Sequence, residues 1–302
     1  MKIGVVGAGV FGGHHAAKIS AHPSAVLSGI ADADPARARA LADREGVDST
    51  DLDELVARSD AVVVASPATA HAAAALTALR AGRHVLVEKP IAATLADAEA
   101  MVGAARQSGA VLQVGHQERF VAQAIGLSSV EEMPLSIRSW RHSTPSPRGR
   151  DVSVTLDLMT HDIDLVLWLL GRESDSVAGQ ARRSPSGTID RAEAVLRFPD
   201  TTVFLSASRI AAKPQRRMEI AYGSGTVSID FAAKTLVNTS RHPLAANFGD
   251  DPRARDSLAS ALEAFVDAVR GGGARAATGE MGLRALRYAL KVDASATGEN
   301  HG

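Results

Sequence analysis

The sequence predicts an α/β Rossmann domain with a parallel, doubly wound sheet, followed by an α+β domain with a large, mainly antiparallel open sheet. The chain opens with a short apolar run, a glycine-rich turn and an alanine-rich helical stretch. Apolar runs then alternate with helical stretches as far as Gly115, which is typical of parallel strands joined by crossover helices. Beyond Gly171, short strand-like runs follow one another directly, which indicates antiparallel neighbours. Because 302 residues are many for one core, we expect two domains, 1–116 and 117–302.

The N-terminal stretch carries the pattern of a dinucleotide-binding βα unit. Lys2–Val6 reads as a buried strand, and the next six residues match G-x-G-x-x-G. Gly7 permits the tight turn, Gly9 lets the backbone approach a pyrophosphate, and Gly12 lets the helix pack close to the strand. Free amide groups at the start of the helix attract phosphate. The predicted cofactor-binding residues of this turn are Gly7, Gly9, Val10, Phe11 and Gly12.

Asp32 ends the second apolar run, twenty residues after Gly12, where a carboxylate can accept hydrogen bonds from an adenosine ribose. Ala33 and Asp34 follow it, so no basic side chain is at hand for a 2′-phosphate. The sequence therefore favours NAD over NADP. The alternative, a glycine-rich turn without a dinucleotide, explains the glycines and leaves Asp32 unexplained.

The elements of the first domain begin and end at clear signals. Pro35 opens a helix that Gly46 ends, Asp51 and Thr94 are side-chain caps, and Gly82 stops another helix. The later strands are expected at Val26–Ala31, Ala61–Ala65, His84–Val87 and Ala110–Val114, and the later helices at Pro35–Arg44, Leu52–Ala57, Thr69–Arg80 and Leu95–Gln107.

The second domain is expected to hold a sheet with helices over one face. Turn signals at Pro199-Asp200 and Gly223-Ser224-Gly225 separate neighbouring strands. The expected strands are Leu135–His142, Val177–Arg182, Asp190–Phe198, Thr202–Arg209, Arg216–Tyr222 and Thr226–Asp230. The expected helices are Phe120–Leu127, the strongly apolar Ser153–Leu170, Arg255–Arg270 and Glu280–Asp293, and we expect the last three to cover the sheet.

The composition is that of an ordinary globular protein. Apolar residues make up 45% of the chain and the formal net charge is −1, which argues against a nucleic-acid or membrane-surface partner. With no cysteine, the chain has no disulfide, thiol nucleophile or cysteine-ligated metal. No apolar run approaches the ~20 residues that span a bilayer, and the first strand begins without a signal peptide, so we expect a cytoplasmic protein.

Three predicted strands of the first domain end in residues that could carry chemistry, at the sheet edge where open α/β sheets bind ligands. These ends read Ser66-Pro67 with His71 at the next helix start, Glu88-Lys89-Pro90, and Gly115-His116-Gln117-Glu118-Arg119. A lysine between an apolar strand and a proline is held stiffly, because proline restricts the residue before it. Taken alone, an exposed turn lysine explains Lys89 better than a catalytic role does.

The apolar helix Ser153–Leu170 carries a second candidate set on one face. Asp157, His161, Asp164 and Trp168 fall at i, i+4, i+7 and i+11. We expect these residues to be partly buried, where ionisable groups need partners or shift their pKa. A structural Asp–His pair is one alternative. A metal site is another, and we predict no metal because no second histidine stands at ligand spacing.

A third candidate set is a run of arginines on a strand and the loop after it. The run consists of Arg138, Arg141, Arg148 and Arg150. Arginine forks suit phosphates. An ordinary solvated loop explains them equally well without further context.

Together these residues resemble the glucose–fructose oxidoreductase / inositol dehydrogenase / MocA family over nearly the whole chain. The resemblance rests on the glycine motif with His15 three residues on, Ser66-Pro67 where the family usually has Thr-Pro, Glu88-Lys89-Pro90, and Asp157-x-x-x-His161. It implies NAD(P)-dependent oxidation or reduction of a sugar or cyclitol carbon, and a cis peptide bond before Pro90. It also implies a homodimer or homotetramer, because the open sheets of the family often pair. The residues it implies are Lys89, Asp157 and His161 for catalysis, and Ser66, Pro67, His71, Glu88 and Lys89 for the cofactor.

Two longer stretches, residues 114–120 and 151–164, resemble the branch that acts at C3 of UDP-N-acetylglucosamine and related nucleotide sugars. That branch usually has Asn-Pro where this chain has Val121-Ala122, and often isoleucine where Thr160 stands. These departures bear on the substrate more than on the reaction. In this branch the arginine run would meet a diphosphate, and the predicted substrate-binding residues are His116, Arg119, Arg141, Arg148, Arg150 and Asp164.

The mechanism that the resemblance implies is oxidation of a secondary alcohol. His161 takes the hydroxyl proton as general base, Lys89 hydrogen-bonds the same oxygen and stabilises developing negative charge, and Asp157 orients the site. Lys89 is the rival proton acceptor. Two other functions stay open: a cyclitol or free-sugar dehydrogenase, and a non-catalytic NAD(P)-binding regulator, against which the presence of all three residues argues.

Overall fold

The computed structural model describes residues 1–146, 151–184, 187–272 and 277–297. The chain forms two compact units. The first consists of Met1–Gln117 and Leu258–Leu283, and the second consists of Glu118–Ser257 and the residues from Arg284 onward. The chain therefore leaves the first unit, builds most of the second, returns to the first and ends in the second.

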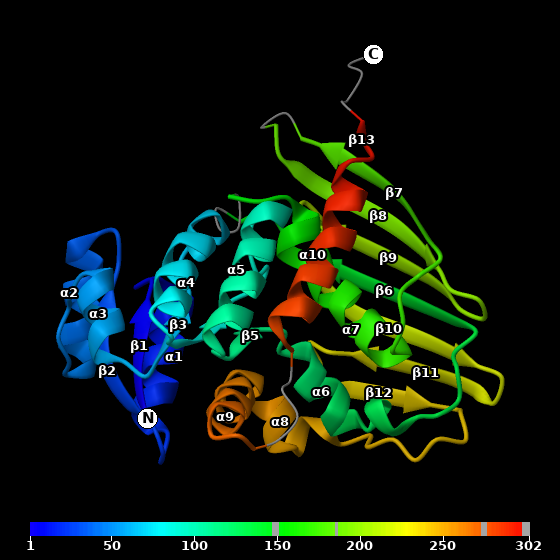
Figure 1. The fold of residues 1–302 in the computed structure, drawn as a ribbon. Helices are drawn as coiled ribbons and strands as arrows, with labels where there is room; N and C mark the ends of the chain where they lie inside the picture. The colour runs from blue at the N-terminus through cyan, green and yellow to red at the C-terminus, as the bar shows by residue number, and fades with distance from the viewer. Residues whose placement is uncertain (147–150, 185–186, 273–276, 298–302) are drawn as a thin grey trace. The chain divides into compact units, whose positions relative to one another are not determined.

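The first unit alternates strands and helices (Figure 1). Its strands are β1 (Lys2–Val6), β2 (Val26–Ala31), β3 (Ala61–Val64), β4 (His84–Val87) and β5 (Leu112–Val114). Its helices are α1 (Val10–Ala21), α2 (Pro35–Glu45), α3 (Leu52–Arg58), α4 (His71–Arg80), α5 (Leu95–Ser108) and α9 (Ser257–Val269), with a 3₁₀ turn at Ala68–Ala70. The predicted end signals are confirmed. Pro35 is the first residue of α2, and Gly46 ends that helix with φ of +70°. Asp51 and Thr94 accept backbone amides at the starts of α3 and α5, and Gly82 follows α4 with φ of +71°.

The sheet of the first unit is parallel throughout, in the order β2-β1-β3-β4-β5. Its strands are almost wholly buried, as expected for a parallel sheet with helices on both faces. Ile3 and Val5 of β1 lie in one apolar cluster with residues of α1, α2 and α9. Gly4 between them faces α3 instead, where an added Cβ would lie 2.7 Å from Leu55 Cγ. The predicted Rossmann arrangement is confirmed.

Helix α9 does not cover the second sheet as the sequence analysis expected. Its buried residues Leu262, Phe265 and Val266 lie in the apolar cluster of the first unit. Strand β5 is an edge strand, and its Gln113 donates through Nε2 to the Ala261 carbonyl at 2.9 Å. The β5 edge also receives the chain after α9, since the amide of Val114 donates to the carbonyl of residue 277. The edge strand therefore gains backbone and side-chain partners from a segment far along the sequence.

The second unit is built on an eight-stranded sheet in the order β12-β11-β10-β6-β9-β8-β7-β13 (Figure 1). The strands are β6 (Ser136–His142), β7 (Ser176–Arg183), β8 (Ile189–Arg197), β9 (Thr202–Ser208), β10 (Gln215–Tyr222), β11 (Gly225–Asp230), β12 (Thr235–Asn238) and β13 (Ala296–Thr297). Neighbours pair antiparallel except β6 with β9 and β7 with β13. The prediction of a mainly antiparallel sheet is confirmed. It missed β12 and β13, which are too short to show an alternating pattern.

The helices of the second unit are α6 (Glu118–Ile125), α7 (Thr160–Leu170), α8 (Pro252–Arg255) and the part of α10 (Gly279–Asp293) from Arg284 onward. The single helix expected at Ser153–Leu170 is two elements. Thr155–Met159 forms a π-helix, and α7 continues from it to Gly171, which ends the helix with φ of +65°. A π-turn is wider than an α-turn and leaves no signature in apolar spacing, so the sequence could not predict it. We call residues Thr155–Met159 the π-turn.

Helical elements cover one face of this sheet, and the other face carries exposed side chains. The π-turn packs on β6, β8 and β9, and α7 packs on β6, over buried residues such as Ile137 and Leu205. The opposite face carries side chains such as Arg138, whose guanidinium lies 5.3 Å from the ring of Phe204. Phe204 is 40% exposed and Val237 of β12 is 65% exposed.

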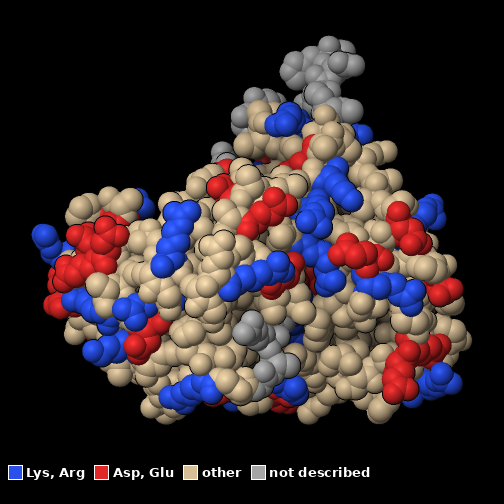
Figure 2. All heavy atoms as spheres, viewed as in Figure 1, with Lys and Arg blue, Asp and Glu red and all other residues tan. Residues whose placement is uncertain are grey.

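The described surface mixes charges of both signs. On the face drawn in Figure 2, acidic and basic side chains lie interspersed among the described residues. No helix in the described ranges is long and apolar enough to cross a membrane. No group of three or more His, Asp or Glu residues among those the structure describes is arranged to hold a metal ion.

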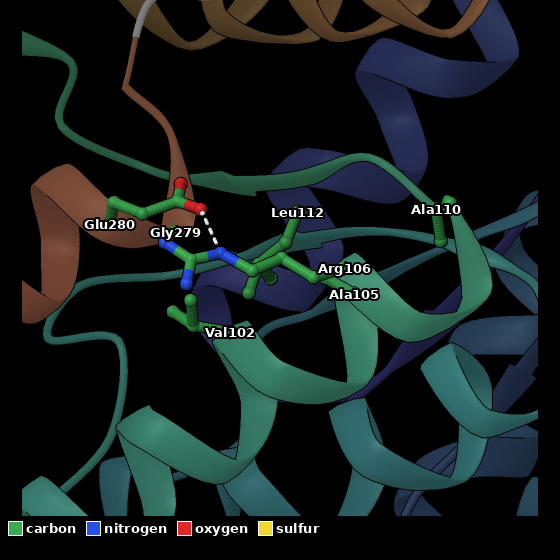
Figure 3. Close-up of a pocket in the computed structure, with 8 residues that line it drawn as sticks. Val102, Ala105, Arg106, Ala110, Leu112, Gly279 and Glu280 are labelled. Carbon is green, nitrogen blue, oxygen red and sulfur yellow. Dashed lines mark hydrogen bonds and ion pairs between the residues drawn. The ribbon is translucent and has the colours of Figure 1, made fainter.

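A small pocket opens in the first unit between the end of α5, the start of β5 and the start of α10 (Figure 3). It has a volume of about 180 Å³. Arg106 and Glu280 point toward one another there and form an ion pair of 3.1 Å. The pocket lies before β5, at the amino end of that strand. Open α/β sheets bind ligands at the carboxyl ends of their strands, so we look for the candidate site at those ends and not at this pocket.

Candidate active site

The glycine-rich turn has the geometry of a dinucleotide cradle. Gly7 has φ of +102°, and an added Cβ would lie 2.6 Å from the Ser66 amide nitrogen. A Cβ on Gly12 would lie 1.7 Å from the Gly7 carbonyl oxygen, so only glycine fits at either position. Gly9 differs, because nothing lies within 4 Å of an added Cβ. Gly9 is also the N-cap of α1 and offers no side chain to its first amides. This open cradle at a helix N-terminus fits a pyrophosphate.

The residues around the glycine turn include two exposed apolar side chains and one carboxylate that is held by hydrogen bonds. Val10 and Phe11 are each 48% exposed. Asp32, directly after β2, accepts the Ala8 amide at 2.6 Å through Oδ2 and the Asp34 amide at 2.8 Å through Oδ1. Each carboxylate oxygen has a further lone pair, so Asp32 can still accept from ribose hydroxyls. The two hydrogen bonds fix the carboxylate at the position that the sequence pattern predicts for it.

His71 connects two of the predicted strand ends. It is 1% exposed, and its Nδ1 lies 2.8 Å from the Pro90 carbonyl while its Nε2 lies 2.9 Å from the Ser66 carbonyl. The Lys89–Pro90 bond between these ends is cis, as the resemblance implied. The structure therefore brings His71, Ser66 and Pro90 together, with His71 bound to backbone on both sides.

Glu88, directly after β4, lies among several polar side chains and is itself buried. Its Oε1 lies 2.8 Å from His15 Nε2 and accepts from Gln117 Nε2 at 3.3 Å. Burial opposes ionisation of Glu88, but the hydrogen bond and charge of His15, with Lys89 and His71 nearby, hold its pKa below the usual range. A Cβ on Gly115 would lie 3.1 Å from Glu88 Oε2, so the close approach needs glycine. Glu88 is therefore an ionised, oriented carboxylate next to Lys89.

In the second unit, the π-turn and the start of α7 carry Asp157 and His161. Both are partly exposed, whereas Asp162 and Asp164, one and three residues beyond His161, are 2% exposed. Asp157 Oδ2 lies 3.9 Å from Arg209 Nη1. The four ionisable groups of this segment thus divide into two that are partly exposed and two that are buried.

Asp164 is bound by Arg119 of α6. Arg119 is fully buried and donates through Nε and Nη2 to the two Asp164 oxygens at 2.7 and 2.5 Å. Its guanidinium carbon also lies 5.4 Å from the Trp168 ring centre. The structure thus pairs Arg119 with Asp164 inside the second unit. The predicted substrate contact of these two residues stays a prediction.

Arg141 of β6 is bound in the same way. It is 5% exposed and donates to both oxygens of Asp162, at 3.0 and 2.9 Å, and to Glu118 Oε1 at 3.3 Å. Glu118 Oε1 also accepts from Arg216. Burial opposes ionisation of Glu118, but the two guanidinium groups keep its pKa low. Arg141 is therefore held by two carboxylates, and its predicted diphosphate contact stays a prediction.

The remaining predicted residues are placed as follows. His116 is 2% exposed in the turn after β5. Arg148 and Arg150 lie outside the described residues. Lys89 belongs to the first unit, and Asp157 and His161 belong to the second.

The sequence analysis gave no role to several residues that the structure places at the site. They are His15 and Gln117 at Glu88, Asp162 at Arg141, and Arg209, Asp190 and Asp293 around the π-turn. His15 could have been found from its place three residues after the glycine motif. The others depend on pairings between distant parts of the sequence, for which the sequence holds no local signal.

Comparison with known families gives the class of protein. The description "Oxidoreductase family, NAD-binding Rossmann fold" matches residues 1–116, and the description "GFO/IDH/MocA C-terminal domain" matches residues 129–228. The chain belongs to the GFO/IDH/MocA family of oxidoreductases.

Three relatives represent the family. UDP-N-acetylglucosamine 3-dehydrogenase of Acidithiobacillus ferrooxidans is 33% identical over 97% of this chain and 96% of its own. Its solved structure superposes with a TM-score of 0.89 at 32% identity, over 98% of this chain and 97% of that one. Myo-inositol 2-dehydrogenase of Thermotoga maritima is 27% identical over 96% of this chain and 95% of its own. The structure of scyllo-inositol dehydrogenase from Lactobacillus casei, with bound NAD(H) and scyllo-inositol, gives a TM-score of 0.79 at 26% identity, over 98% of this chain and 96% of that one.

Proposed function

We propose that this oxidoreductase transfers a hydride between nicotinamide and a secondary alcohol of a sugar, and that the sugar is a UDP-N-acetylglucosamine-like nucleotide sugar oxidised at C3. The assignment of the catalytic residues rests on one observation, the different burial of four ionisable groups on the π-turn and the start of α7. Asp157 and His161 stay partly exposed, while Asp162 and Asp164 are buried in arginine pairs. The buried pairs hold the segment, and we assign the two partly exposed groups to the substrate.

Each catalytic residue has a separate role in this proposal. His161 accepts the hydroxyl proton, since imidazole titrates near neutral pH. Lys89 donates a hydrogen bond to the same oxygen and stabilises its developing charge. Asp157 orients the site. Bound NAD would supply the hydride acceptor, and Gly7, Gly9, Gly12, Asp32 and Glu88 would hold it.

NAD is the proposed cofactor rather than NADP. Asp32 is fixed at the end of β2 by two backbone amides, and its negative charge would repel a 2′-phosphate. Ser66, Pro67 and His71 form the loop beside the glycine turn, so we include them among the cofactor-binding residues.

The substrate proposal is supported by the relative acting on UDP-N-acetylglucosamine, which is similar over nearly the whole chain. The inositol dehydrogenases are the specific observation in favour of a second candidate, a cyclitol or free-sugar dehydrogenase. The test is the rise in absorbance at 340 nm that reports NADH or NADPH formation. The substrates are UDP-N-acetylglucosamine, related UDP-sugars, myo-inositol, scyllo-inositol and free glucose, and each is tested with NAD and with NADP. We expect turnover with a UDP-sugar and NAD. Turnover with inositols alone would replace the substrate, and NADH binding without any turnover would favour a regulatory protein.

We further propose that the chain forms a homodimer or homotetramer. The open face of the large sheet exposes Phe204 and Val237, and charges of both signs lie among them, such as Arg138 and Glu219. A surface with both signs can match a second copy of itself around a two-fold axis. Light scattering after size-exclusion chromatography tests this, and a monomer at all concentrations would contradict it.

A further inference from the structure

The short segment that carries Asp157 is held in place from two sides. It starts at Val152 and runs through the π-turn to His161. The carbonyl of Val152 accepts from Arg209, and Ser153 and Thr155 both donate to Asp293 at the end of α10. These contacts involve three of the five residues that precede Asp157 in the segment.

Arg209, just after β9, is the anchor on one side. It is 6% exposed and donates through Nε to Asp190 Oδ1 at 2.5 Å and through Nη2 to the Val152 carbonyl at 2.7 Å. Its remaining terminal nitrogen, Nη1, lies 3.9 Å from Asp157 Oδ2. One planar guanidinium thus contacts β8, the start of the segment and the Asp157 carboxylate. The first two contacts are hydrogen bonds that hold the guanidinium, and the third is an ion-pair distance at which its charge acts on Asp157.

Asp293 is the anchor on the other side. Ser153 Oγ donates to its Oδ2 at 2.6 Å, and Thr155 Oγ1 donates to its Oδ1. The Ser153 hydroxyl also accepts the Leu156 amide at 3.3 Å, and the Ser153 carbonyl accepts the Asp157 amide at 2.9 Å. The segment therefore keeps its fold through Asp293 when the Arg209 fork is removed, so a variant of Arg209 should fold.

The hydrogen bond from Arg209 to Asp190 keeps the Arg209 side chain directed at the segment. Burial opposes ionisation of Asp190, but hydrogen bonds from Ser184, Arg209 and Thr188 keep its pKa below the usual value. A charged Asp190 holds the Nε edge of the guanidinium, which leaves the Nη groups directed at Val152 and Asp157. The Arg209 side chain has one orientation because both edges are engaged.

We propose that Arg209 is a positioning residue for the reaction, acting through Asp157: it holds the segment at Val152 and keeps a positive charge beside the Asp157 carboxylate. This inference rests on the proposed dehydrogenase function. It adds a residue from a distant strand end to a site that the sequence pattern confines to Lys89, Asp157 and His161.

The test is a double-mutant cycle on the full chain with Arg209→Met and Asp157→Asn. Arg209→Met should lower kcat about 10²-fold, the loss that follows a misplacement of about 1 Å, with the KM for NAD unchanged. In the Asp157→Asn background the same change should alter kcat by less than about threefold, because the group through which it acts is already gone. Arg209→Lys should recover kcat only in part, because an ammonium keeps the charge without the fork. Equal losses in both backgrounds would overturn the proposal.

A second measurement separates this inference from the proposed function. Hydrogen–deuterium exchange at the amides of residues 156 and 157 should be about tenfold faster in Arg209→Met, the effect of losing one hydrogen bond from a charged group. The matched control is Arg197→Met, since Arg197 is exposed on β8. If the wild type is inactive with every sugar, the proposed function fails, yet faster exchange still supports the anchor. Unchanged exchange in Arg209→Met overturns the anchor whatever the activity.

Discussion

Gly9 is the residue on which the cofactor assignment depends most directly. Its φ of −77° suits any residue, and nothing lies within 4 Å of an added Cβ, so Gly9→Val should fold normally. The new side chain would occupy the space where a pyrophosphate approaches. We expect NADH affinity to fall by about 5- to 150-fold, since overpacking costs ~1–3 kcal/mol. Fluorescence titration with NADH measures the change.

Gly103→Val is the matched control, because a Cβ there also meets nothing within 4 Å and the residue lies within α5. It should leave NADH affinity unchanged. An unaltered dissociation constant in folded Gly9→Val would remove the dinucleotide assignment.

Asp32 should decide between the two nicotinamide cofactors. Asp32→Ser removes the charge that repels a 2′-phosphate and keeps one acceptor for the Ala8 amide. The preference for NADH over NADPH should therefore narrow, measured as the ratio of the two dissociation constants. Asp34→Ser is the control, because serine can still cap α2. A wild type that binds NADPH as tightly as NADH would contradict this role of Asp32.

Lys89 and His161 should each be needed for turnover. Lys89→Ala and His161→Ala should each lower kcat by about 10²–10⁴, the range for a lost acid–base group, with little change in NADH binding. The double variant should lose less than the product of the single losses, because the proposed mechanism assigns both groups to one oxygen of the substrate. Steady-state kinetics beside cofactor titration measures both, with the exposed Lys213→Ala as control. Full activity in either single variant would refute its role.

At the residue scale, the sequence predicted local geometry better than long-range contacts. The glycine turn and the place of Asp32 follow from a local motif, the family resemblance implied the cis bond before Pro90, and the structure has all three. The buried arginines did not follow in this way. Arg119 and Arg141 are bound by Asp164 and Asp162, which are far along the chain, so only the fold reveals that these guanidinium groups are engaged.

At the scale of elements, α9 illustrates the difference between finding a helix and placing it. Its amphipathic pattern predicted the helix within a few residues. The same pattern fits either sheet, because any apolar face can cover any apolar surface. Its actual partner is the core around Ile3 and Val5, to which it contributes the fully buried Phe265.

Phe265→Ala should therefore destabilise the first unit. Removing a buried phenylalanine leaves a cavity and costs about 3–5 kcal/mol. We expect a lower midpoint of thermal unfolding and earlier loss of NADH binding on heating. Asp267→Ala, on the exposed side of the same helix, is the control and should change little. A midpoint equal to that of the wild type would show that α9 does not stabilise this core.

At the scale of the whole molecule, two non-contiguous stretches complete the first unit. Residues 1–117 alone lack α9 and the backbone partner of Val114 on β5. A fragment of residues 1–117 should therefore unfold without cooperativity, or aggregate, and should not bind NADH. Circular dichroism melting and NADH titration test this against the full chain. A fragment that melts cooperatively and binds NADH would show that the returning stretch is dispensable.

This discontinuity has a consequence during synthesis on the ribosome. The Rossmann strands emerge first, but the stretch that covers the edge of β5 follows only after residues 118–257. At ~5–20 residues per second this interval lasts about seven to thirty seconds. Throughout that time the nascent chain presents an open strand edge, which is a template for pairing with other chains. The first unit therefore cannot complete its fold before the second unit has been synthesised. We expect it to depend on chaperone protection until α9 and the stretch after it have emerged.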